Sequence, residues 1–211
     1  MLFPEGLILA LRTERSGTRP DSDGVKEDYP YGECSVLRRL TTADEAAAFV
    51  LPGLYLGLHI TNGSPSGERV EWLKKEMVDR DLGSPAALGE FELIADTGGE
   101  DASGIRGGLV VLTDNLDPER DVEFNRWYDT VHVPEIMEVG TYRRARRYRL
   151  GNVTPGPRFL AIYETDWDDP VAAHRPMQEN LPKMHLWDAV KSYQNGDYGP
   201  GERGSRIPDG G

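Results

Sequence analysis

Residues 107–136, GGLVVLTDNLDPERDVEFNRWYDTVHVPEI, predict a strand followed by a helix and decide the fold of the second half of the chain. The run GGLVVLTDNL (107–116) is short, apolar and rich in β-branched residues, which is typical of a buried strand. Four aromatic or apolar residues then recur at the i, i+3, i+4 and i+7 positions of one helix face: Phe124, Trp127, Tyr128 and Val131. The periodicity therefore changes from strand to helix within thirty residues.

The ends of this helix carry their own signals. Asp121 is placed to cap its amino terminus, and Glu123 in the first turn favours the positive end of the helix dipole. Pro134 is expected to kink or end the helix, because proline has no N–H to donate.

Three more strands are expected downstream. TYRRARRYRL (141–150) alternates and is rich in aromatic residues and arginine, and RFLAIYETD (158–166) is a second apolar run after a Gly/Pro turn. KSYQNGDY (191–198) supplies a last short strand.

A helical region lies between the last two of these strands. Asp169 followed by Pro170 is a favourable helix start, because proline is tolerated at the first helical position. The region is expected to run to about Val190, with breaks at Pro176 and Pro182. The resulting order, βαββαβ, is that of a ferredoxin-like module.

The first half of the chain repeats this order incompletely. A long polar loop, 15–33, stands where the module would have its first helix. Two pairs of similar segments, GLILAL with GLVVLT and LYLGLHIT with FLAIYETD, support a duplication. The expected elements are strands at 6–13, 34–42, 53–61 and 89–96 and a helix at 68–78.

The sequence therefore predicts an α+β protein of two ferredoxin-like halves that form an antiparallel barrel. A Gly-rich linker, 96–106, divides the chain. We expect a degenerate half at 1–98, a second half at 105–198 and a loose tail at 199–211.

The composition of the chain argues against some classes of binding partner, namely nucleic acids and membranes. The net charge of −12 argues against a general affinity for nucleic acid, which needs clustered positive charge to displace counterions. Cys34 is the sole cysteine, so an intramolecular disulfide framework is excluded and a reducing compartment is favoured. The amino terminus does not resemble a signal peptide, and the longest apolar run, 46–58, is too short for a membrane span. We expect a cytoplasmic protein without a membrane partner.

The segments FNRWYDTVHVPEI, RRARRYRL and RFLAIYETD together suggest a family. They resemble the dimeric α+β barrel superfamily and, within it, the EthD-like branch, chiefly through the WYxxxHxP pattern of residues 127–134. The resemblance covers residues 107–198 and extends to 6–96 only as strand order. The first half has no WYxxxH pattern of its own.

The resemblance implies two four-stranded sheets that close a barrel, from two chains or from two halves of one, and a homodimer is the expected assembly. It implies a cavity for a small, often aromatic or polyketide-like molecule. Members include cofactor-free monooxygenases, isomerases, cyclases, decarboxylases, haem enzymes and proteins without a known reaction. The fold alone therefore does not choose a chemistry.

His132 is the leading candidate for catalysis. On a helix it lies one turn after Tyr128 and three residues after Asp129, so both side chains could reach it. A carboxylate beside an imidazole orients its tautomer and raises its basicity, as a general base requires. Alternatively, His132 bonds a backbone carbonyl near Pro134 and only fixes the local geometry.

The two aromatic residues of the pattern also have two possible interpretations. Trp127 and Tyr128 could wall an aromatic substrate, and the Tyr128 hydroxyl could donate to a developing oxyanion. The alternative is core packing, which is favoured for Trp127 because it shares the apolar stripe of the helix.

Five arginines lie in the ten residues 141–150 of an acidic protein. On a strand, Arg144, Arg146 and Tyr148 share one face, opposite Arg147 and Arg149. A buried arginine needs an anion, which is either a substrate group held by Arg144 or Arg146 or a carboxylate of the protein itself.

Two further residues are candidates for lining the cavity. His59 shares a polar strand face with Tyr55 and Gly57, and Tyr163 occupies the matching position in the second half. For His59 the alternative is a half-exposed histidine at a sheet edge.

The sequence supports no resident cofactor. His174 and His185 have no compact set of carboxylate or thiolate ligands around them, so no metal site is predicted. A single axial histidine to a non-covalent haem is not excluded by spacing. Nucleotide-binding motifs are absent from the sequence.

The leading hypothesis is a cofactor-independent enzyme that transfers protons on an aromatic or polyketide-like, anionic substrate, as a cyclase, isomerase or decarboxylase does. His132 would be the base, Asp129 its orienting partner, and Tyr128 the stabiliser of an enolate. One alternative is a non-catalytic ligand-binding or assembly module of the same fold. Another is a monooxygenase or haem-dependent enzyme.

Overall fold

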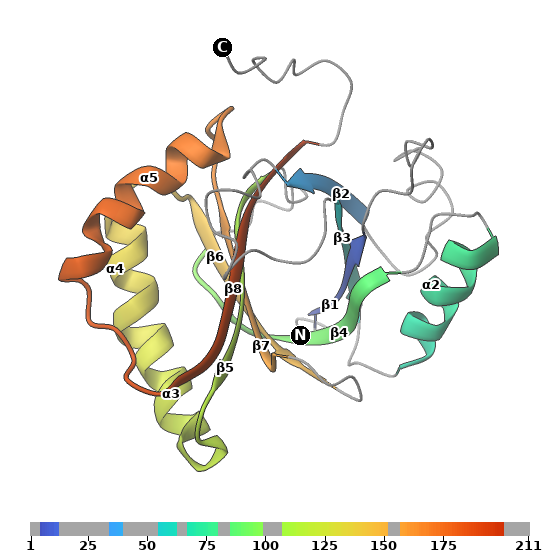
Figure 1. The fold of residues 1–211 in the computed structure, drawn as a ribbon, viewed down its shortest axis with the longest axis horizontal. Helices are drawn as coiled ribbons and strands as arrows, with labels where there is room; N and C mark the ends of the chain where they lie inside the picture. Colours follow the sequence, from blue (N-terminus) through green and yellow to red (C-terminus); the bar gives the residue numbers. More distant parts are fainter. Residues whose placement is uncertain are drawn as a thin grey trace.

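The computed structural model describes residues 5–12, 34–39, 55–62, 67–79, 85–98, 107–151 and 157–200 (Figure 1). The strands are β1 (Glu5–Arg12), β2 (Cys34–Arg39), β3 (Tyr55–Asn62), β4 (Pro85–Asp96), β5 (Gly108–Asn115), β6 (Arg144–Leu150), β7 (Phe159–Glu164) and β8 (Val190–Pro200). The helices are α2 (Glu68–Asp79), α3 (Asp121–Trp127), α4 (Val133–Glu138) and α5 (Pro170–Asn180), with short turns η1 (Pro118–Arg120), η2 (Tyr128–His132) and η3 (Leu181–Lys183).

The eight described strands pair as a closed barrel in the order β1-β3-β2-β8-β5-β7-β6-β4. Neighbouring strands are antiparallel, and β2 with β8 and β4 with β6 join the strands of the first half to those of the second. Within each half the strands lie in the order fourth, first, third, second. The predicted α+β, ferredoxin-like fold with an antiparallel sheet is confirmed.

The strands of the second half have two buried faces. Helices α3, α4 and α5 lie along the outer face of β5–β8, and α2 lies on the opposite side of the barrel, beside β4 (Figure 1). Leu109 and Val111 of β5 pack with the helices in one hydrophobic cluster. Val110 and Leu112 are equally buried but face the barrel interior, because side chains alternate along a strand.

The helical segment 121–138 continues past its proline. Its middle turn is a π-helix, in which the N–H of Val133 donates to the carbonyl of Tyr128. Pro134 has no N–H, and in a regular α-helix its ring would clash with the carbonyl of Thr130. The wider turn accommodates the proline, so the predicted kink or end is replaced by a π turn inside a continuous helix.

The start of this segment also differs from the prediction. Asp117, rather than Asp121, accepts a capping hydrogen bond, from the N–H of Glu119 at 3.0 Å. Asp121 is the first residue of α3, and its carboxylate pairs with Arg158. Gly140 ends the segment at φ 80°, a backbone conformation that favours glycine.

Helix α5 begins as predicted and ends early. The Asp169 carboxylate accepts hydrogen bonds from the N–H groups of Val171 and Ala172 at 3.0 and 3.1 Å. The predicted break at Pro176 is wrong, since packing of the buried Met177 and its neighbours outweighs one lost hydrogen bond. The helical region stops at Lys183 rather than near Val190. Residues 184–189, called the strap below, connect it to β8 without a helix or strand of their own.

Some predictions lie outside the described residues. They concern the loop 15–33, most of the linker 96–106 and the tail beyond Pro200, to which β8 extends. Within the described ranges, no helix combines the length and the apolar character needed to cross a bilayer.

Candidate active site

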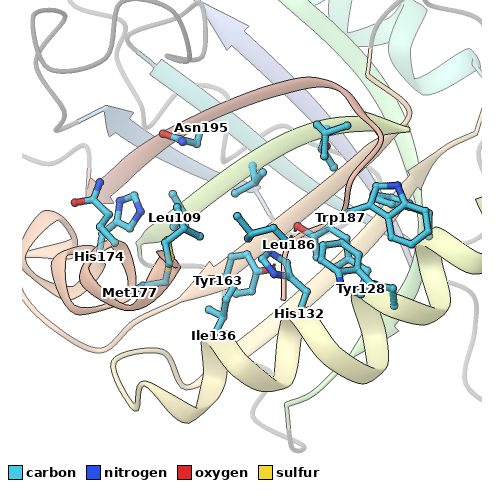
Figure 2. Close-up of a pocket in the computed structure, with 17 residues that line it drawn as sticks. Leu109, Tyr128, His132, Ile136, Tyr163, His174, Met177, Leu186, Trp187 and Asn195 are labelled. Carbon is cyan, nitrogen blue, oxygen red and sulfur yellow. Dashed lines mark hydrogen bonds between the residues drawn. The ribbon is translucent and has the colours of Figure 1, made fainter. Parts of the chain in front are cut away.

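A cavity of about 370 Å³ lies between the outer face of β5, β7 and β8 and the helical layer (Figure 2). Its walls come mainly from aromatic and aliphatic side chains of α3, α4, α5 and the strap. None of the described residues that line it is an aspartate, glutamate, lysine or arginine. The polar lining residues are Thr113, Tyr128, His132, Tyr163, His174, Gln178 and Asn195.

The cavity is therefore not between facing sheets, where the hollow was expected. Leu109, Val111 and Thr113, on one face of β5, line the cavity, whereas Val110 and Leu112 on the other face do not. Large side chains separate the helices from the sheet, and the cavity lies between these two layers.

His132 projects from the π turn onto the cavity wall (Figure 2). Its ring stacks on Trp127 with centroids 4.8 Å apart and meets Tyr128 edge-on at 4.9 Å. Burial lowers the pKa of His132 to about 4; nearby Glu135 opposes this shift and Arg147 adds to it. Its Nδ1 is buried without a hydrogen-bond partner among the described residues. At neutral pH this imidazole is uncharged and has an unused polar atom.

The structure does not bring Asp129 to His132, as the sequence analysis predicted. The Asp129 carboxylate instead pairs with Arg147 of β6, whose other guanidinium nitrogen donates to Asn125 Oδ1 at 2.7 Å. The Arg147 guanidinium also lies 4.0 Å from the centroid of the Tyr128 ring. Because the Asp129 carboxylate is paired with Arg147, it cannot orient the His132 imidazole.

Two tyrosines meet at the floor of the cavity. The Tyr163 hydroxyl lies 3.4 Å from the Tyr128 hydroxyl, and both side chains are buried. Burial raises the pKa of Tyr128, although Arg147 opposes this shift. Both predicted tyrosines therefore line the cavity, and because the Tyr163 hydroxyl donates to Tyr128, the Tyr128 hydroxyl can donate to a ligand.

Trp127 meets both of its alternative descriptions. It lines the cavity, and it also packs against the hydrophobic cluster. Its indole N–H donates to the carbonyl of His185 in the strap at 2.9 Å. This hydrogen bond ties the strap to the wall that carries His132.

A second histidine in the cavity was missed as a functional residue. His174 of α5 is buried and lines the cavity, and its Nδ1 lies 2.9 and 3.0 Å from the two carboxylate oxygens of Asp197 on β8. A carboxylate at Nδ1 favours the tautomer in which Nδ1 carries the proton and Nε2 is left as the acceptor. The two residues are 23 positions apart on different elements, so no local pattern pointed to them.

The predicted substrate-binding arginines lie on the other face of the sheet. Arg146 is buried in the barrel and pairs with Glu164 at 2.8 Å. Arg144 pairs with Asp96 at 2.5 Å. Tyr148, on the same face, is fully buried away from the cavity. Internal pairing, the alternative to substrate binding, is thus the arrangement found for both arginines.

The surroundings of the buried Glu164 carboxylate, which pairs with Arg146, change its pKa. Desolvation raises the pKa of Glu164, and the coulombic effect of Arg146, Arg143 and Arg144 only partly offsets it. Arg143 adds a second pairing, at 3.1 Å. The charges of this cluster are therefore paired within the protein, without a ligand.

Comparisons with known proteins agree on the fold. The chain is similar to the structure of a Fusobacterium nucleatum protein provisionally named as a monooxygenase (TM-score 0.55, 11% identity, covering 94% of this chain and 92% of that one). It is also similar to a monooxygenase-like protein from Listeria innocua (0.53, 11%, 96% and 96%) and to a major regulator of staphylococcal pathogenesis (0.56, 12%, 93% and 99%). At these identities the likeness shows the fold alone. No protein-family model matches the sequence, and the curated proteins include no match to it.

The described side chains also bear on metal binding. Among the described residues, no group of three His, Cys, Asp or Glu side chains could hold a metal ion. A volume of about 370 Å³ is near the lower end for pockets that hold drug-sized molecules. The remaining candidate, His59, belongs to β3, and its side chain lies outside the described residues.

Proposed function

We propose that this chain is a cofactor-independent enzyme that removes a proton from a small, hydroxylated aromatic or polyketide-like molecule. The observation that carries the proposal is the buried His174–Asp197 pair at the wall of an apolar cavity. A carboxylate that holds Nδ1–H leaves Nε2 as the proton acceptor and stabilises the imidazolium that forms.

His132 has a different role in this proposal. An imidazole with a pKa of about 4 is a weak base, but its neutral form can donate one hydrogen bond. A neutral imidazole that polarises a carbonyl or phenol oxygen stabilises the negative charge that appears there when a proton is removed. The prediction of His132 as the base therefore becomes a proposal of His132 as hydrogen-bond donor, with His174 as base.

The lining favours a substrate that enters without charge. The cavity has aromatic walls and, among its described lining residues, no cation to pair with an anion. We propose a planar, neutral, weakly acidic substrate that ionises only after it binds, in place of the anionic substrate expected from the arginines. In the reaction Nε2 of His174 takes the proton, and the electron pair stays on the substrate as an enolate or phenolate.

Such an anion is the starting point for several reactions. Isomerisation, cyclisation and decarboxylation proceed through it, and an electron-rich carbanion can also react with dioxygen. The monooxygenase-like name of the similar Listeria innocua protein supports the last outcome as the second candidate. Proton removal is common to both candidates and is the step to be tested first.

We further propose that the barrel is a pair of ferredoxin-like halves of one chain. The shared strand order of β1–β4 and β5–β8 supports this. A barrel whose edges pair within one chain needs no second copy for closure, so the homodimer stays a prediction for measurement of mass in solution.

The experiment uses 1,3-dihydroxynaphthalene, a neutral two-ring probe, in deuterated buffer. NMR would follow exchange of the hydrogen at C2, which lies between the two hydroxyl-bearing carbons. We expect catalysed exchange by the natural protein and a loss of about 100-fold or more in His174→Gln, since a positioned general base typically contributes that much. The probe's dissociation constant should change much less.

His185→Gln is the matched control, because this histidine is exposed and does not line the cavity. It should retain exchange. Probe binding without catalysed exchange would favour the non-catalytic ligand-binding module, and equal exchange by His174→Gln and the natural protein would refute His174 as the base.

A further inference from the structure

The indole of Trp187 closes one end of the cavity (Figure 2). It belongs to the strap 184–189 and packs against Phe124 and Trp127, with ring centroids 5.7 and 5.5 Å away. The guanidinium of Arg120 lies 4.4 Å from its ring centroid. A ring in this position limits the length of any planar molecule that lies between the layers.

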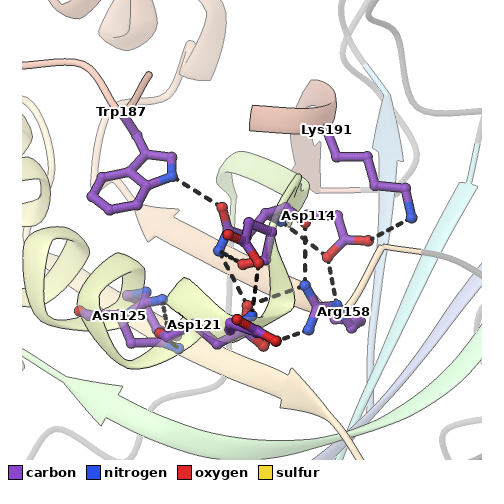
Figure 3. Close-up of polar contacts among 10 residues, drawn as sticks. Asp114, Asp121, Asn125, Arg158, Trp187 and Lys191 are labelled. Atoms are coloured by element: carbon purple, nitrogen blue, oxygen red, sulfur yellow. Dashed lines mark hydrogen bonds and ion pairs between the residues drawn. The ribbon is translucent and has the colours of Figure 1, made fainter. Parts of the chain in front are cut away.

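One polar contact sets the rotation of this ring. The indole N–H of Trp187 donates to Oδ1 of Asn115 at 3.0 Å (Figure 3). Asn115 is buried at the end of β5, outside the cavity lining. Trp187 is half-buried, and an indole N–H that is partly shielded from water gains from a protein acceptor, so the hydrogen bond favours the observed orientation.

The orientation of the Asn115 amide is itself determined. Its Nδ2 donates to the carbonyl of Asp117 at 2.6 Å and to the carboxylate of Asp121 at 3.2 Å. Both partners are acceptors, so the amide nitrogen must face them and the amide oxygen must face Trp187. A flipped amide would lose all three contacts.

Charged residues hold this amide in place (Figure 3). The Arg158 side chain donates to Asp114 at 2.6 Å and to Asp121, and it also reaches the carbonyl of Asn115 at 3.3 Å. These contacts join the end of β5 to the starts of β7 and α3. The amide is therefore part of a rigid cluster, whereas the strap that it anchors has no strand or helix of its own.

We infer that Trp187 is the residue that determines substrate size, and that Asn115 is its positioning residue. The inference rests on the proposed function, because it specifies which substrates the same cavity accepts. With the indole anchored, the cavity accepts a two-ring molecule and disfavours a longer one. Without the anchor, the ring can rotate away and a three-ring molecule gains affinity relative to a two-ring one.

The test compares two probes, 1,3-dihydroxynaphthalene and anthracene-1,3-diol, whose dissociation constants are measured by titration. Trp187→Phe removes both the N–H and part of the ring. Asn115→Ala leaves the indole unchanged and removes its acceptor, together with the hydrogen bonds that the amide donates to Asp117 and Asp121. Each should shift the ratio of the two constants toward the three-ring probe by about threefold to tenfold, the usual effect of one hydrogen bond. In the double variant, Asn115→Ala should add little to Trp187→Phe, because Asn115 acts through the indole.

Trp167→Phe is the matched control, since this tryptophan is exposed and does not line the cavity. It should leave the ratio unchanged. An unchanged ratio in Trp187→Phe would overturn the inference alone, and full additivity in the double variant would overturn the role of Asn115. Failure of the natural protein to bind either probe would overturn the proposed function, and the inference with it.

Discussion

The two faces of the C-terminal sheet bury polar side chains in different ways. On the barrel side, the buried Arg146 and Glu164 stand 2.8 Å apart, and each charge has its counterpart in the protein. On the helix side, the cavity wall holds His132 with a buried Nδ1 that has no partner among the described residues. The helix side also holds one paired charge, because Arg147, next to Arg146 on β6, points to the helices and pairs there with Asp129.

This difference assigns stability to the barrel side of the sheet and reactivity to the helix side. Burying a charge is costly unless an opposite charge and hydrogen bonds accompany it, so the barrel cluster is closed and self-sufficient. A neutral imidazole can be buried at lower cost, and the His132 ring lies on the wall of a cavity that can hold a ligand. On this view the barrel side holds the fold together, and the helix side carries the chemistry.

The largest effect is expected where the barrel cluster is broken. Arg146→Met leaves the Glu164 carboxylate buried with only part of its compensation, and removal of one partner of a buried pair typically costs about 3–5 kcal/mol. Denaturant unfolding should show this loss. The double change Arg146→Met/Glu164→Gln should recover part of it, because the uncompensated charge is gone. A loss below about 1 kcal/mol in the single variant would contradict a structural role for the pair.

A smaller, pH-dependent effect is expected on the helix side. The pKa of His132 falls from 6.5 to about 4 in the folded protein, so the unfolded chain takes up this proton first as the pH drops. The stability that depends on neutral His132 is fully present above pH 6.5 and is lost as the pH falls toward 4, by up to about 3 kcal/mol, since one pKa unit corresponds to about 1.4 kcal/mol.

The variant His132→Phe keeps an aromatic ring on Trp127 and removes the titration. Its free energy of unfolding should stay close to that of the natural protein above pH 6.5 and fall less steeply between pH 6.5 and 4. Denaturation curves at several pH values measure both. Parallel pH profiles for the two proteins would mean that the imidazole is solvated rather than buried.

The smallest effect is expected for an arginine that lies outside both buried environments. Arg149 pairs with Glu92 at 3.1 Å, and both side chains are well exposed. Exposed ion pairs contribute about 0–1 kcal/mol, so Arg149→Gln should unfold within 1 kcal/mol of the natural protein. This variant is also the control for Arg146→Met, because it removes an arginine from the same strand.

Much of this comparison could be predicted from local sequence. The WYxxxHxP pattern put Trp127, Tyr128 and His132 close together on one helical segment, and the strand pattern made Tyr163 a candidate for lining a cavity. The structure brings all four to one cavity, although it lies outside the barrel and not between facing sheets. Alternation along β6 separated the arginines into two sets, but it does not say which set faces the helices. The register does: Ala145 pairs with Tyr163, so residues of odd number in β6 share the helix face.

The remaining features depend on tertiary packing. His174 and Asp197 meet only because α5 crosses β8, and neither residue has a neighbour in sequence that marks it. Pro176 stays inside α5 because Ala173 and Met177 pack on the sheet, which a rule based on proline alone does not include. Local propensity is a weak guide where packing decides.

The most direct test of the account is to locate a bound ligand by NMR with isoleucine methyl labels. Ile136 lines the cavity, and Ile162 is buried on the barrel side of β7. On titration with 1,3-dihydroxynaphthalene, the ring current should shift the Ile136 methyl signal and leave that of Ile162 nearly unmoved. The reverse pattern would place the ligand in the barrel beside Arg146 and would contradict the assignment of chemistry to the helix side.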